Sequence, residues 1–169
     1  MAILNPEHLF EQAEKLIMPP GAGAPRQADL RRAISAAYYG IFHAILGFAA
    51  DEFVGATKRT SKQYSLVYRS IHHHSLRVIC VEIEKPKLSA RYLPYQPANG
   101  FGPNIQSFAA AFLELQEKRH AADYDPLFRV RTSEASLLVK AARDALDRFR
   151  KASKPGRKVF LTLLLFPPR

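Results

Sequence analysis

Residue types that can handle a phosphate group gather in the segment from Lys118 to Pro126, which reads KRHAADYDP. It contains Arg119, His120, Asp123 and Tyr124. A guanidinium binds phosphate oxygens through two parallel hydrogen bonds, and an imidazole titrates near neutral pH. Metal-independent cleavage of RNA needs a base for the 2′-hydroxyl proton, an acid for the leaving oxygen and a cation beside the phosphorane. The segment therefore supplies candidate catalytic residues for that reaction.

A purely structural interpretation of Arg119 is also open. This residue comes four positions after Leu115 and continues an apolar helix stripe, where solvent would not place a charged side chain. The side chain must extend outward from the helix end or meet a polar partner inside the fold. Asp123 lies one helical turn further on, and an ion pair between the two would only brace the helix.

A second polar set lies in the stretch from Leu30 to Leu46, LRRAISAAYYGIFHAIL. Four-residue steps place Arg31, Ser35, Tyr39 and His43 in one row along a helix. An apolar face runs beside the row and comprises Ile34, Tyr38, Ile41, Ile45 and Phe48. Serine, tyrosine and histidine at the edge of a core indicate a buried or half-buried hydrogen-bonding row. The row is either a satisfied core network or a support for a functional site.

A further helix is predicted to begin at a Ser61 cap and to continue through the stretch from Val67 to Cys80. On it, Arg69 and His73 stand one turn apart and are candidate supporting residues. Three consecutive histidines, 72 to 74, point to different sides of a helix and cannot all bind one metal ion. The single cysteine leaves no thiolate cluster. We therefore expect neither a metal nor a cofactor.

Charge is the most informative feature of the composition. The 169 residues include 25 Lys and Arg against 15 Asp and Glu, a net charge of +10. Six of the basic residues fall between Arg148 and Lys158. Such an excess favours nucleic acid or an acidic partner. The N-terminal stretch lacks the features of a signal peptide, and the apolar tail VFLTLLLF is too short to span a bilayer. The expected protein is soluble and cytoplasmic, with no membrane partner.

Helix signals and punctuating prolines predict an all-α fold, a single antiparallel bundle of five or six helices. One domain is expected over residues 1–169, with its core at 27–153. A short helix at 6–17, capped by Asn5, precedes a flexible connection and the central helix, from about 27 to about 50. Residues 81–102 form an irregular loop, and helices start at Pro103 and Thr132. The tail at 159–166 is a short helix or extended segment that covers the core or a partner.

The last two long helices have predicted buried stripes. In the helix that Pro103 opens, the stripe is Ile105, Phe108, Phe112 and Leu115. In the helix that begins at Thr132, it is Leu137, Leu138, Ala141, Ala145, Leu146 and Phe149.

Three stretches, in this order, resemble the HEPN superfamily, helical domains named for nucleotide binding in higher eukaryotes and prokaryotes. The stretch from Leu30 to Leu46 resembles the family's long opening helix, with its Arg, Ser, Ala-Tyr-Tyr and Phe-His. The stretch VYRSIHHHSLRVIC, from Val67 to Cys80, resembles the middle helix. The segment from Lys118 to Pro126 resembles the Arg-x-x-Ala-Asp-Tyr segment of one prokaryotic branch. Together they cover most of residues 27–153, so the resemblance implies a HEPN-like domain.

The resemblance also implies a site and partners. Active HEPN ribonucleases carry an arginine, four to six residues and a histidine near a helix junction, usually in a homodimer whose two copies form one cleft. Arg119 matches the motif arginine, but Tyr124 stands where active members keep histidine. His120 follows Arg119 directly and points about a quarter turn away. This branch is often encoded beside small nucleotidyltransferases. The implied partners are RNA or a nucleotide, a second copy of the chain and a nucleotidyltransferase-type antitoxin.

Two functions from different classes follow. The first is a HEPN toxin-like RNA-binding protein or metal-independent endoribonuclease of a toxin-antitoxin pair, with Arg119 on the phosphate. A variant of it has Tyr124 as a hydroxyl that a partner nucleotidyltransferase modifies. The second is a non-catalytic nucleotide-binding or protein-interaction module, in which Arg119, Asp123 and Tyr124 only brace a helix junction.

Overall fold

The structure is a computed structural model that describes residues 3–18, 21 and 23–169. Those residues form an all-α bundle of seven α-helices and two short 3₁₀ turns, with no strand among them. The all-α prediction is confirmed, with more helices than the five or six expected. The helices are α1 (Pro6–Ile17), α2 (Gln27–Phe53), α3 (Lys62–Ser70), α4 (His73–Glu84), α5 (Gly102–Tyr124), α6 (Thr132–Lys151) and α7 (Lys154–Leu165), and the 3₁₀ turns are η1 (Ala56–Lys58) and η2 (Leu93–Tyr95).

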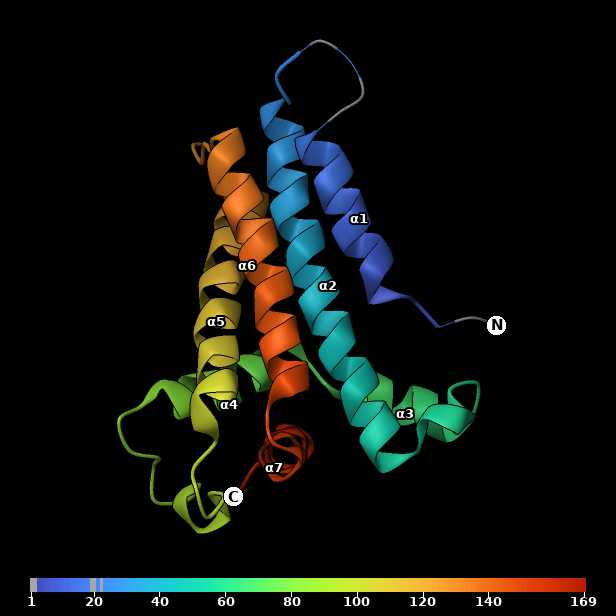
Figure 1. Ribbon diagram of the computed structural model, residues 1–169, viewed down its shortest axis with the longest axis vertical. Helices are drawn as coiled ribbons and strands as arrows, with labels where there is room; N and C mark the ends of the chain where they lie inside the picture. The colour runs from blue at the N-terminus through green and yellow to red at the C-terminus, as the bar shows by residue number, and fades with distance from the viewer. Residues whose placement is uncertain (1–2, 19–20, 22) are drawn as a thin grey trace.

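Four helices run along the length of the molecule and three lie across one end of it (Figure 1). Helices α1, α2, α5 and α6 pack side by side and reverse direction from one to the next along the chain, so that the neighbours α2 and α6 run parallel. Helices α3, α4 and α7 lie near the end of the bundle where α2 finishes. Because α2 and α5 are antiparallel, the beginning of α2 lies against the end of α5. This pairing brings Arg31 to Ala122 and Tyr39 to Arg119.

Helix α2 is the core of the bundle. Its predicted apolar face is confirmed, since Ile34, Tyr38, Ile41 and Ile45 are fully buried. Phe48 is half-buried and packs against the core. Within the described chain, α2 is long and apolar enough to cross a membrane, but 78% of its apolar window is buried by other helices. Buried core helices share these properties, so the neighbours of α2 account for its composition.

Helix α1 is capped locally and is fastened to α2 by an aromatic contact and to α6 by ion pairs. Asn5 caps it by accepting a hydrogen bond from the Glu7 backbone amide, as its sequence predicts. The buried ring of Phe10 packs on Gly40 of α2. Arg143 of α6 forms ion pairs with Glu7, at 2.5 Å, and with Glu14, at 2.7 Å. The predicted N-terminal helix is therefore an integral part of the bundle.

The helix predicted to continue from Ser61 through Cys80 is in fact two helices. Ser61 caps α3 as expected, but α3 ends at Ser70, whose hydroxyl donates to the Val67 carbonyl. Such a local bond competes with continuation of the helix. Ile71 is extended and buried, and α4 begins at His73. The prediction failed because the buried Ile71 anchors a turn that apolar spacing alone does not reveal.

Three other expectations needed adjustment. Helix α4 reaches Glu84, so the irregular connection is shorter than 81–102 and includes η2. The stripe predicted in α5, by contrast, is confirmed, because it is buried throughout. In α6, Leu137 is 66% exposed and Ala141 is also exposed, and the alanines and valine at 135, 139 and 142 face the core in their place. Small side chains let α6 lie close to its neighbours, which shifts the buried face from the one the leucines suggested. The tail is a helix, α7, with its apolar side buried.

The contact between Phe10 and Gly40 predicts a specific effect on stability. A Cβ atom at position 40 would lie 2.9 Å from ring carbons of Phe10, which is too close. Overpacking of this kind costs about 1–3 kcal/mol, which exceeds the roughly 1 kcal/mol that alanine gains over glycine in a helix. We expect Gly40→Ala to lower the free energy of unfolding measured by urea denaturation. Gly47→Ala is the matched control, because nothing lies within 4 Å of a Cβ there. An unfolding free energy that rises equally in both variants would contradict the packing.

Candidate functional site

Arg119 extends from α5 toward α2 and lies among three tyrosine rings. Its Nη2 atom donates a 2.7 Å hydrogen bond to the hydroxyl of Tyr39. The guanidinium carbon lies 5.3 Å from the ring centres of Tyr38 and Tyr39 and 5.8 Å from that of Tyr124. Ring faces attract cations, most strongly where water is excluded. The Arg119 side chain is only 16% exposed, so this charge is held at the edge of the core.

Asp123 forms the ion pair with Arg119 that the helical spacing predicted. Arg119 Nε lies 2.8 Å from Asp123 Oδ2, although the N–H direction does not complete a hydrogen bond. The other carboxylate oxygen accepts a 2.5 Å hydrogen bond from the buried hydroxyl of Ser35. Burial alone would lower the pKa of Arg119, but Tyr39 and Asp123 outweigh it and raise that pKa. The arginine therefore stays charged.

These contacts join the two polar sets that the sequence singled out. Ser35 and Tyr39 come from the row on α2, whereas Arg119 and Asp123 come from α5. The result is a connected chain from Ser35 through Asp123 and Arg119 to Tyr39. The antiparallel packing of α2 on α5 brings together residues 80 and 88 positions apart in the sequence.

His73 lies on the other side of the tyrosine pair, at the first turn of α4. Its Nδ1 atom lies 2.8 Å from the hydroxyl of Tyr38, and its ring stacks on Phe42 at 3.9 Å. The ring centre is 5.8 Å from that of Tyr39. Burial lowers the pKa of His73, and the positive charge of Arg119 lowers it further. The imidazole is therefore neutral at pH 7 and able to accept a proton.

Tyr38 connects His73 to α5. The amide nitrogen of Gln116 donates to the Tyr38 hydroxyl at 3.2 Å, and Arg77 donates to the Gln116 amide oxygen at 3.1 Å. Burial raises the pKa of Tyr38 to about 12, so its hydroxyl remains protonated. Sequence reasoning assigned Tyr38 to the apolar face and overlooked Gln116. Gln116 lies three residues before Arg119, on the same side of α5, and that spacing could have identified it.

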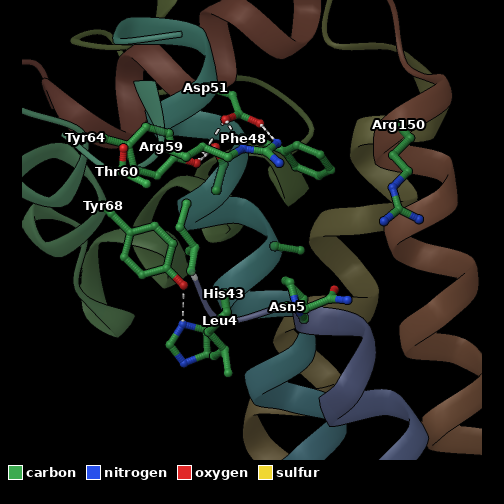
Figure 2. Close-up of a pocket in the computed structure, with 14 residues that line it drawn as sticks. Leu4, Asn5, His43, Phe48, Asp51, Arg59, Thr60, Tyr64, Tyr68 and Arg150 are labelled. Carbon is green, nitrogen blue, oxygen red and sulfur yellow. Dashed lines mark hydrogen bonds and ion pairs between the residues drawn. The ribbon is translucent and has the colours of Figure 1, made fainter. Parts of the chain in front are cut away.

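His43 continues the site along α2. Its Nδ1 atom lies 2.8 Å from the hydroxyl of Tyr68 on α3, and burial lowers its pKa. Two hollows meet at this histidine. A smaller one of about 220 Å³ extends toward Ser35 and Tyr39, and a larger one of about 540 Å³ extends toward α3 (Figure 2). His43 and Leu4 line both, so the two hollows lie next to each other along α2, and we call the pair the recess.

Three candidates lie outside this cluster or have another role. The exposed His120 packs beside Tyr124, with ring centres 5.0 Å apart. Arg69 is exposed on α3 and, because the helix breaks, does not share a helix with His73. Arg31, from the α2 row, donates to the carbonyls of Ala122, Asp125 and Phe128 at the end of α5. A cation suits the negative end of a helix dipole, so this role is structural.

Comparison of the chain with protein-family models, curated proteins and solved structures found no match. Among the described residues, no three His, Cys, Asp or Glu side chains come together in a group that could hold a metal ion. The chemistry of the site therefore has to be argued from the arrangement of its side chains.

Burial and the positive charge of Arg119 together predict a low pKa for His73. We expect a pKa below the ordinary 6.5, because burial and Arg119 both disfavour the imidazolium. The folded protein then binds fewer protons than the unfolded chain, so this contribution to stability is complete above about pH 6.5 and is lost as the pH falls below it. Arg119→Gln should raise the pKa part of the way back. NMR titration of the imidazole would measure it.

Lys118→Gln is the matched control, since Lys118 is an exposed cation on the same helix. The pKa of His73 in Lys118→Gln should equal the pKa of His73 in the wild-type protein. A His73 pKa that does not change in Arg119→Gln would contradict the described coupling.

Proposed function

We propose that this protein binds RNA at Arg119 and cleaves it without a metal ion, as a HEPN-like, toxin-type endoribonuclease. One observation carries this proposal: a charged arginine is held among three tyrosine rings, and a neutral histidine lies beside two of them, Tyr38 and Tyr39. The net charge of +10 supports it, since attraction to phosphates supplies most of the affinity of non-specific RNA binders.

Arg119 is the group that binds the phosphate. Its Nη2 atom donates to Tyr39, its Nε atom lies in ion-pair contact with Asp123, and Nη1 makes no hydrogen bond to the described residues. A phosphate oxygen can take that place without breaking either contact. Tyr38 is fully buried, but the exposed ring of Tyr124 beside the guanidinium offers a face on which a base can stack. Asp123, held by Ser35, fixes the direction of the arginine and is a positioning residue.

His73 and Tyr39 are the groups that transfer protons. Neutral His73 accepts the proton of the 2′-hydroxyl as its oxygen attacks phosphorus. The bond from phosphorus to the 5′-oxygen breaks, and that oxygen takes the phenolic proton of Tyr39, whose hydroxyl oxygen already accepts from Arg119. The products are a 2′,3′-cyclic phosphate and a 5′-hydroxyl. The rings of His73 and Tyr39 are in edge-to-face contact, with centres 5.8 Å apart, so the phosphate binds beside this pair rather than between the two rings.

A second candidate is a module that binds a nucleotide or a partner without cleaving RNA. It is favoured by the existing ion pair of Arg119 and by Tyr124, which stands where the resemblance calls for histidine. Tyr124 is 66% exposed, so its hydroxyl is open to modification by a nucleotidyltransferase partner. A homodimer and a cytoplasmic location remain predictions of the resemblance and the composition.

Cleavage of single-stranded RNA in excess chelator tests the first candidate. We expect the wild-type protein to cut, and Arg119→Gln to lose about 10²-fold or more of the rate, as when a transition-state cation or donor is removed. Lys118→Gln should cut normally. Circular dichroism would show that both variants are folded. Equal cleavage by Arg119→Gln and wild type, or no cleavage by either, would contradict the endoribonuclease and favour the binding module.

The pH dependence of cleavage tests the role of His73 separately. Because burial and Arg119 lower the pKa of His73 below 6.5, the rate should rise with pH along a limb centred below 6.5. His73→Gln should remove that limb and slow the reaction by about 10²- to 10⁴-fold, the usual contribution of a general base. An unchanged limb in His73→Gln would show that another group takes the proton.

A further inference from the structure

The row of polar residues on α2 continues beyond the site. After Tyr39 and His43, the same four-residue step reaches Gly47 and Asp51. The larger hollow is lined by His43, Gly47 and Asp51. From Tyr39 to Asp51 the helix rises about 18 Å. The two hollows are neighbours along α2, because His43 lines both of them. Arg119 lines neither hollow, but Tyr39, whose hydroxyl accepts from Arg119, lines the smaller one.

Gly47 is the feature that packing does not explain. Glycine inside a helix costs about 0.5–1 kcal/mol relative to alanine. Gly40 has a packing reason, because Phe10 occupies the place of its side chain. At Gly47, by contrast, a Cβ would meet nothing within 4 Å, and the backbone is ordinary helix. Gly47 lines the larger hollow, so a larger side chain at this position would have open space to enter.

The walls of the larger hollow combine aromatic rings with positive charge. Figure 2 shows Arg150 across the hollow from Tyr64 and Tyr68, with the pair of Arg59 and Asp51 at one end. Arg59 is neutralised by Asp51, because its Nε and Nη2 atoms each donate a hydrogen bond to one of the two carboxylate oxygens. Arg150 is 51% exposed, and its one ion pair, to Asp147, is open to solvent and weak. Tyr64 is itself buried, so the ring faces of the hollow come from the half-buried Tyr68 and Phe48, and Arg150 is its one excess cation.

We propose that this hollow binds a nucleotide of the same single-stranded RNA whose phosphate lies at Arg119, an inference that rests on the proposed function. The base stacks on the aromatic wall over Gly47, and Arg150 neutralises its phosphodiester. The strand follows the recess from Tyr39 past His43, whose second ring nitrogen makes no hydrogen bond to the described residues. A duplex cannot follow this path, because its bases are paired and unavailable for stacking. The substrate is therefore unpaired RNA that extends a few nucleotides beyond the cleaved bond.

Binding of oligonucleotides of increasing length tests this subsite. The probes are fluorescent 2′-O-methyl RNAs of about two to eight nucleotides, which resist cleavage, and the measurement is fluorescence anisotropy. For the wild-type protein we expect affinity to increase once the strand is long enough to reach the hollow. Gly47→Leu, which fills the hollow, should weaken the long probes about tenfold, in the range expected for one stacked base, and leave the shortest unaffected. Arg150→Gln should make the binding affinity for long probes, and for these only, depend less strongly on salt concentration.

Two controls are matched to these variants. Ala110→Leu adds the same side chain at an exposed position of α5, and Arg148→Gln removes a neighbouring exposed cation that does not line the hollow. Both should bind all probes as the wild type does. Thermal unfolding monitored by circular dichroism would establish that each variant is folded.

The outcomes separate the subsite from the proposed function. If Arg119→Gln weakens every probe while Gly47→Leu binds like wild type, the subsite is overturned and the proposed function stands. If Gly47→Leu weakens the long probes while Arg119→Gln has no effect, the hollow is an RNA site and the proposed function is overturned. If no probe binds the wild-type protein, both are overturned.

Discussion

The burial of α2 is the constraint on which the rest of the structure depends. Its polar side chains cannot reach bulk water freely, so each must find a partner on a neighbouring helix. Ser35 finds Asp123, Tyr39 finds Arg119, and His43 finds Tyr68. Tyr38 likewise meets His73 and Gln116. The hydrogen bonds that satisfy the core helix thereby align α3, α4 and α5 against it, and the same bonds assemble the candidate site.

Arg119 serves the fold and the proposed chemistry through the same contacts. A charge at the edge of a core has lost part of its hydration, and Asp123, Tyr39 and the tyrosine rings replace it. A cation held in this way needs little reorganisation when a phosphate arrives. It also depresses the pKa of the nearby His73, which keeps the imidazole ready to accept a proton. Stability and reactivity are therefore not independent at this site.

The sequence predicted the elements better than their contacts. Helix caps at Asn5 and Ser61 and the apolar spacing of α2 and α5 lie within single segments, so they can be recognised locally. The pair of Arg119 with Asp123 is also local and was predicted. The break at Ile71 was not, because it depends on how that side chain is buried by distant helices. For the same reason the sequence identified Tyr39 and Arg119 as candidate site residues but did not reveal the hydrogen bond between them. The role of Arg31 as a cap for α5 likewise depends on a helix about 90 residues away.

The central claim is that the guanidinium of Arg119 itself binds RNA. Nitrogen-15 NMR of the arginine side chains, recorded during titration with a 2′-O-methyl oligonucleotide, tests it most directly, and the Arg119→Gln spectrum assigns the signal. The account predicts that the Arg119 guanidinium signals shift in proportion to binding, while those of Arg143, held by Glu7 and Glu14, stay unchanged. An Arg119 signal that stays unchanged while the oligonucleotide binds would contradict it.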